Sequence, residues 1–113
     1  MSEIDKLIAA YEIDVQFPDV SGMEHLEMLL MRTEIARLDE HLTAPQRQRL
    51  AKADQMLVEQ ARRFYEAIDR IADLRQWRDE QNAPPAHWWW YLDVLAQLPE
   101  PATPGSPPQA VPA

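Results

Sequence analysis

The sequence predicts an all-α fold made of one small domain. Its 113 residues include only 2 glycines and no cysteine, and apolar residues recur at helical spacing over most of the chain. The 10 prolines stand mainly between these helical segments and near the C-terminus. We therefore expect a helical domain over residues 1–98 and a disordered, proline-rich tail over residues 99–113, which has too few apolar side chains to form a core.

The first predicted helix covers about residues 3–16. Its apolar residues fall at i, i+3, i+4 and i+7, and so share one helical face: Ile4, Leu7, Ile8 and Tyr11. Over residues 11–17 apolar and polar residues also alternate, which is typical of a strand. Such a strand would need a neighbour from a second copy or a partner to pair its backbone groups. We favour the helix, ended by Phe17-Pro18 because the residue before proline avoids the α conformation.

The second predicted helix covers about residues 22–42. Ser21 can cap its N-terminus, and Glu24 follows three residues later, as in a capping box. Apolar residues then recur at alternating spacings of three and four: Met28, Met31, Ile35, Leu38 and Leu42. This stripe predicts a helix that buries one face.

The third predicted helix, about residues 44–81, is long and central. Thr43 and Gln46 form a second capping box around Pro45, which fits the first turn because its missing N–H is not needed there. A heptad spacing, typical of coiled coils, relates four apolar residues: Leu50, Leu57, Phe64 and Ile71. The helix would be about 57 Å long. We expect helix 22–42 to fold back over its first half.

A short fourth helix, about residues 86–98, follows the breaker Asn82-Ala83-Pro84-Pro85 and is expected to cover the second half of the central helix. It carries the run His87-Trp88-Trp89-Trp90-Tyr91. In steps of about 100° per residue, Trp89 points to solvent, whereas Trp88 and Trp90 lie on inward faces.

This aromatic end is the predicted partner surface, because tryptophan is favoured at the centres of protein interfaces. The predicted partner-binding residues are Trp77, His87, Trp88, Trp89, Trp90 and Tyr91. The competing interpretation is that Trp88 and Trp90 pack on the central helix and Trp89 lies flat on the surface.

Charge is distributed unevenly along the chain. The sequence has 19 acidic and 11 basic residues, a net charge of −8, and residues 1–42 hold ten of the acids but only three of the bases. The one basic region begins the third helix, where the candidate contacts to nucleic acid or a partner are Arg47, Arg49, Lys52, Arg62 and Arg63. The overall acidity opposes nucleic-acid binding. These arginines can instead complement acidic helices of the same chain or of a second copy.

The residues that support catalysis or metal binding are not found in the required patterns. Without cysteine there is no thiolate metal site. No glutamate is followed three positions later by histidine, the spacing used by carboxylate–histidine metal sites in helical bundles. We predict no catalytic residue, no cofactor and no metal site.

These observations together predict a non-enzymatic, cytoplasmic protein that acts as an interaction or adaptor module and forms a homodimer. The chain shows no secretory signal and no apolar run long enough to cross a membrane. The alternative is an acidic regulator of the antitoxin type, which would mask a basic partner and touch nucleic acid through the arginines that begin the third helix.

Overall fold

The computed structural model describes residues 3–98, which contain α-helices, 3₁₀-helices and turns but no strand, and this confirms the all-α prediction. The predicted tail 99–113 lies outside the described residues. The helical elements are α1 (Glu3–Asp14), α2 (Gly22–Arg37), the 3₁₀-helix η1 (Asp39–His41), α3 (Ala44–Glu59), α4 (Ala61–Asp69), α5 (Leu74–Glu80), the 3₁₀-helix η2 (Trp88–Tyr91) and α6 (Leu92–Leu95).

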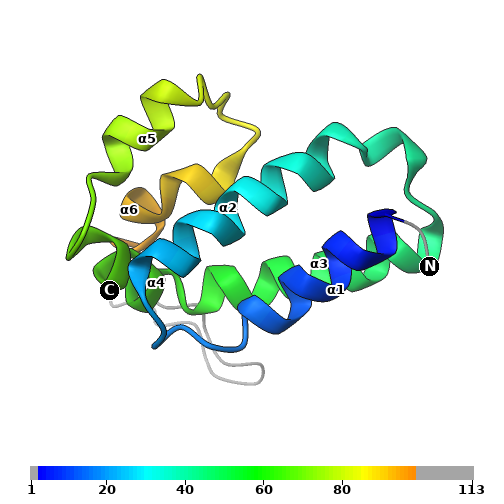
Figure 1. Cartoon of the computed structure of the whole chain (residues 1–113), viewed down its shortest axis with the longest axis horizontal. Helices are drawn as coiled ribbons and strands as arrows, with labels where there is room; N and C mark the ends of the chain where they lie inside the picture. The colour runs from blue at the N-terminus through cyan, green and yellow to red at the C-terminus, as the bar shows by residue number, and fades with distance from the viewer. Residues whose placement is uncertain (1–2, 99–113) are drawn as a thin grey trace, which may run out of the picture.

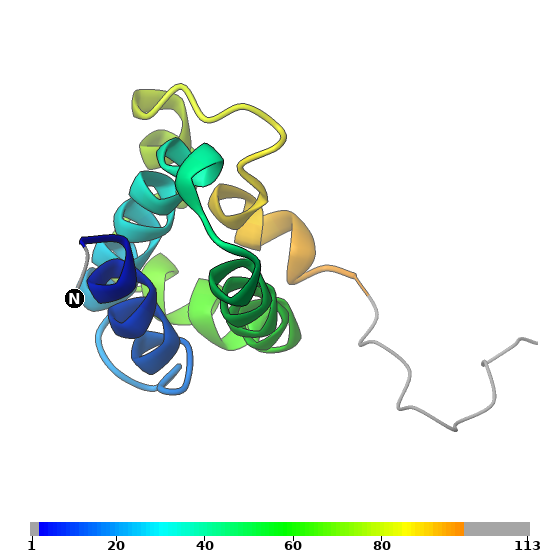
Figure 2. The same ribbon diagram turned by 90° about the vertical axis from the view of Figure 1, so that its right-hand side faces the viewer.

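The N-terminal helix α1 packs on both α2 and α3, and it lies below α2 and in front of α3 in Figure 1. Figure 2 shows these three helices nearly end-on, with α1 beside the other two. Further along, α4 packs on α2 and on α6, and α5 packs on η2. The first half of the predicted central helix is therefore covered by α1 rather than by α2, and α2 reaches over to cover the second half together with α6.

The choice between helix and strand at residues 11–17 is settled in favour of helix. The Val15 N–H donates to the carbonyl of Tyr11 at 3.1 Å, in the α-helical pattern, before the chain tightens into a turn at Gln16. Tyr11 and Val15 are both buried, four residues apart, whereas Ile13 between them is exposed. The alternation of apolar and polar residues therefore does not correspond to a strand.

Both predicted N-terminal caps are present. Ser21 Oγ accepts from the backbone N–H of Glu24 at 3.3 Å. Thr43 Oγ1 accepts from the N–H of Gln46 at 3.3 Å, and the Gln46 side chain accepts from the N–H of Thr43 at 2.8 Å, which completes the predicted capping box. Local side-chain chemistry therefore fixes the starts of α2 and α3.

The predicted helix 22–42 is too long, because α2 ends at Arg37 and the chain continues as η1. Asp39 and Glu40 would have placed two negative charges at the negative end of the helix dipole, which is unfavourable. In η1 the Asp39 carboxylate and carbonyl instead accept from Arg47 at 2.9 and 2.6 Å.

The predicted continuous helix 44–81 is also wrong, because it is divided into α3, α4 and α5. At Gln60 no proline or glycine is present, and the division follows the change of packing partners from α1 to α2 and α6. The division between α4 and α5, by contrast, is marked by a local helix cap. Asp73 caps α5 by accepting from the N–H of Arg75 at 3.0 Å, and the heptad residue Ile71 therefore lies outside a helix and is exposed.

The predicted helix 86–98 is replaced by η2 and the short α6. The breaker before it is confirmed, since Asn82 takes a left-handed conformation (φ 50°) just after α5 ends. A 3₁₀-helix has three residues per turn, so residues three apart are aligned. Trp89 is therefore aligned with the buried Leu92 rather than with Asp93 and Gln97.

The crossing of α2 and α4 depends on Gly22. A Cβ atom placed on Gly22 would overlap the carbonyl oxygen of Ala67 in α4 and would stand 2.8 Å from Cγ1 of Ile71. The absence of a side chain therefore allows the backbones of the two helices to approach closely.

Gly22→Ala is expected to destabilise the protein. Alanine is normally the better helix former by about 1 kcal/mol, but the overlap with the α4 backbone forces the helices apart, and overpacking of this kind costs about 1–3 kcal/mol. Urea unfolding of the variant measures the net effect, with the exposed neighbour substitution Met23→Ala as control. A Gly22→Ala protein at least as stable as the parent would contradict the close approach.

Candidate functional site

The aromatic run predicted to bind a partner is largely part of the core. Trp89 is only 2% exposed and Trp90 is fully buried, so the predicted solvent-facing position of Trp89 is wrong. The physical reason is the 3₁₀ winding of η2, which turns consecutive residues further than an α-helix does. The remaining residues predicted for this surface are half-buried: Trp77, His87, Trp88 and Tyr91.

Both buried indoles bind the same hydroxyl. The Nε1–H groups of Trp89 and Trp90 each donate to Thr33 Oγ1 at 2.9 Å, and the Thr33 hydroxyl donates to the carbonyl of Leu29 at 2.9 Å. A buried indole N–H needs an acceptor, and one threonine on α2 satisfies two of them. The sequence separation of more than fifty residues hides this pairing from any local pattern.

A buried ion pair lies beside these tryptophans. Arg32 on α2 donates to both carboxylate oxygens of Asp54 on α3, at 2.8 and 2.9 Å, and its guanidinium lies 4.2 Å from the ring centroid of Trp89. Tyr11 on α1 also donates to Asp54, at 2.6 Å. Burial, followed by the charge of Asp54, raises the pKa of the Tyr11 hydroxyl, so it stays a donor. This cluster, which we call the Arg32 network, joins α1, α2, α3 and η2.

A second ion pair secures the C-terminal segment. Arg78 on α5 donates to Asp93 on α6 at 2.7 Å and to the carbonyl of Trp90 at 3.2 Å, and its guanidinium lies 4.4 Å from the ring centroid of Tyr91. Tyr91 in turn donates to the carbonyl of Ala83 at 3.0 Å. The polar groups of the aromatic segment are therefore directed mainly at the protein itself.

Four of the five predicted basic contacts are engaged within the chain. Arg47 pairs with Asp39, Arg49 pairs with Glu12 at 2.7 Å, Arg62 donates to the carbonyl of Ala96, and Arg63 pairs with Asp19. The hydrogen bond from Arg49 lowers the pKa of the Glu12 carboxyl. Lys52 is exposed and has no ion-pair or hydrogen-bond partner among residues 3–98. The five side chains do not form one basic patch facing a single ligand.

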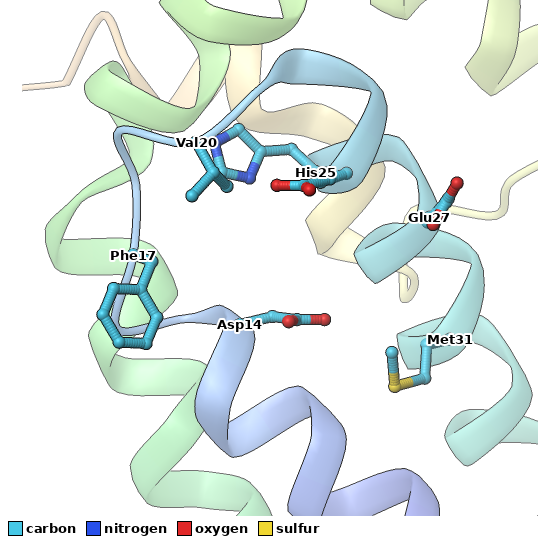
Figure 3. A pocket seen from close by; sticks show the side chains of 7 residues that line it. Asp14, Phe17, Val20, His25, Glu27 and Met31 are labelled. Carbon is cyan, nitrogen blue, oxygen red and sulfur yellow. The ribbon is translucent and has the colours of Figure 1, made fainter.

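A groove lies between the end of α1 and the first turns of α2, and we call it the acid-rimmed groove (Figure 3). Its volume is about 310 Å³. Figure 3 shows Asp14 at the end of α1 opposite Glu27 and Met31 on α2, with Phe17 and Val20 on the connecting loop. The lining residues are Asp14, Phe17, Val20, Glu24, His25, Glu27 and Met31.

The electrostatics of this groove favour positive charge. Burial raises the pKa of Asp14, and the nearby carboxylates of Glu24 and Glu27 raise it further, whereas His25 acts in the opposite direction. His25 is buried beneath the rim, donates through Nε2 to the carbonyl of Pro18 at 2.9 Å and packs edge-on against Phe64. Burial lowers the pKa of His25, so the imidazole is neutral near pH 7.

None of the residues that line this groove was among the predicted site residues. A signal was present, because the loop Phe17-Pro18-Asp19-Val20 places two large apolar residues among acids. Their exposure could not be known before the helices were arranged.

Within residues 3–98 no three side chains among His, Cys, Asp and Glu come close enough together to hold a metal ion. None of the helices in this part of the chain is long and apolar enough to cross a bilayer.

Thr33→Val tests the shared acceptor of the two indoles. Valine has a similar shape but no hydroxyl, so two largely buried N–H groups lose their partner, and each such loss costs about 1–3 kcal/mol. We expect chemical denaturation to show a free energy of unfolding lower by about 2 kcal/mol or more. In a Trp90→Phe background the same substitution should cost less, because one donor is already gone. Equal costs in the two backgrounds would refute the shared bond.

The pH dependence of stability tests the buried His25. Its pKa in the folded protein lies below the ordinary value of 6.5, so at pH values below 6.5 the unfolded chain binds the proton more readily. The free energy of unfolding should therefore fall as the pH is lowered from about 7 to 5.5, by at most about 1.4 kcal/mol per pH unit from this group. His25→Gln, which keeps a donor for Pro18 but does not titrate, should flatten that slope. An unchanged slope would show that His25 is not responsible.

Comparisons with known proteins give no relative from which a function could be transferred. No family model matches the chain, and no curated protein or solved structure is significantly similar to it.

Proposed function

We propose that the protein is a non-enzymatic module for protein–protein interaction and that it binds a basic, apolar segment of a protein partner in the acid-rimmed groove. The observation that carries this proposal is the combination of exposed apolar side chains with carboxylates that form no ion pair with lysine or arginine among residues 3–98. This surface replaces the tryptophan run, in which Trp89 and Trp90 are buried.

The apolar part of the groove is supplied by the connecting loop. Phe17 is 53% exposed and Val20 is 40% exposed, and both line the groove together with Met31. Large apolar side chains gathered around a concave surface favour a binding role, because burying them against a partner removes apolar area from water. His25 below the rim is held by Pro18 and Phe64, so the base of the groove is set before binding.

The negative charge of the groove comes from acidic side chains that form no ion pair with lysine or arginine in the described part of the chain. Asp14, Glu24 and Glu27 have no lysine or arginine within ion-pair distance among residues 3–98. By contrast, the acids Glu12, Asp19 and Asp39 are paired with arginines of α3 and α4. A partner that brings lysine or arginine next to an apolar side chain would complement this arrangement.

The arrangement of the basic residues gives less support to a regulator that touches nucleic acid. Arg47, Arg49 and Arg63 face acids of their own chain, and Arg62 binds a backbone carbonyl. Lys52 alone among the five candidate contacts has no partner in the described chain. We therefore place the partner surface on the acidic side of the molecule.

The double substitution Glu24→Lys/Glu27→Lys is expected to weaken binding of a basic peptide strongly. The probe is a synthetic helical peptide with leucines on one face, flanked by lysines, and its affinity is measured by fluorescence anisotropy at low and high salt. We expect affinity for the unchanged protein to fall with salt, because the rim acts through exposed charges. The variant should bind at least about tenfold more weakly, since attraction is replaced by like-charge repulsion.

The matched control is Asp79→Lys/Glu80→Lys, which makes the same change of net charge on exposed residues of α5. Val20→Asp tests the apolar contact separately and should weaken binding at all salt concentrations. An equal loss in the α5 control, or no binding by the unchanged protein at low salt, would overturn the assignment of the groove.

A further inference from the structure

A second groove lies on another side of α1, where α1 packs on α3. Its volume is about 440 Å³, and its lining residues are Ala9, Glu12, Ile13, Gln16, Arg49, Lys52, Ala53 and Met56. Ile13 is 56% exposed and Met56 is 36% exposed, whereas the small Ala53 between the helices is buried. The groove therefore has a small residue at its base and a large apolar side chain from each helix at its edge.

Opposite charges stand on either side of Met56 beside this groove. Lys52, Met56 and Glu59 stand at i, i+4 and i+7 of α3, and so lie on one face of the helix. The lysine is about 6 Å before Met56 along the helix axis, and the glutamate about 4.5 Å after it. When two α3 helices pack antiparallel about a two-fold axis near Met56, Lys52 of each copy comes opposite Glu59 of the other.

We propose that this face is the contact surface between two copies of the chain, which form a two-fold symmetric dimer through α3 and the end of α1. An isologous interface requires one patch that complements itself. This face can complement itself, because it has an apolar centre at Met56 and Ile13 and opposite charges on either side of that centre. Lys52 has no partner within the described chain, and Glu59 accepts only from the Gln55 side chain, at 3.3 Å.

This inference identifies a binding surface separate from the acid-rimmed groove. Ile13 lines one groove and Asp14 the other, and adjacent residues on a helix point about 100° apart. The dimer would thus present two acid-rimmed grooves, and a partner with two basic segments would gain affinity from binding both. Dimer formation does not require that any partner binds.

A charge exchange tests the two-fold contact. Sedimentation equilibrium of the full chain over a range of concentrations should show a monomer–dimer equilibrium. Lys52→Glu and Glu59→Lys should each weaken dimerisation by about tenfold or more, because each single change places like charges opposite each other twice. The double variant Lys52→Glu/Glu59→Lys restores opposite charges across the axis, and its dimerisation should return towards that of the unchanged protein.

The controls separate this surface from a general effect of charge and from loss of the fold. Arg75→Glu on α5 and Glu40→Lys make the same charge changes on exposed residues that do not line the groove, and neither should alter dimerisation. Circular dichroism of each variant checks that the helices remain.

Two results would overturn the inference. One is a strict monomer at high micromolar concentration. The other is a double variant that dimerises no better than the single variants. The Lys52→Glu protein should still bind the basic peptide at its acid-rimmed groove, so loss of dimerisation and loss of partner binding are distinguishable.

Discussion

A guanidinium can stay inside a small protein only when its charge and its donors are satisfied, and this requirement fixes the arrangement of four elements here. Arg32, whose side chain is only 9% exposed, takes its counterion Asp54 from α3 and lies over the ring of Trp89 from η2. Tyr11 from α1 donates a further hydrogen bond to the Asp54 carboxylate. Because these partners come from three other elements, α1 must pack on both α2 and α3, and the aromatic segment must turn inwards.

This dependence explains how much of the fold could be predicted from the sequence. Helix starts at Ser21 and Thr43 depend on hydrogen bonds within a few residues, and both were predicted. The break at Gln60 has no proline, glycine or cap beside it, and it is set by the partners that α3 and α4 each pack on. The burial of Trp89 was missed for a related reason. Its direction was derived from α-helical steps, but the need to reach Thr33 and Arg32 favours the tighter winding of η2.

The candidate binding surface was predictable only in its charge. The excess of acids before residue 43 is visible in the sequence, but which acids remain available depends on pairing across the fold. Arg49 pairs with Glu12 and Arg63 pairs with Asp19, so two of the basic residues that suggested a nucleic-acid surface are paired with acids of the same chain. That alternative was part of the sequence analysis. The sequence alone could not show which carboxylates have no lysine or arginine partner in the described fold, namely those that line the acid-rimmed groove.

Both grooves open beside the end of α1, and this placement links binding to stability. A chain of 113 residues buries a modest share of its surface, so some large apolar side chains stay exposed. Here Ile13, Phe17 and Val20 gather where α1 leads into α2. A molecule that covers either groove contacts α1 in its docked position, which the unfolded chain does not offer. Binding at either groove must therefore raise the free energy of unfolding by mass action, and the helix that completes the Arg32 network is the element that each binding event holds in place.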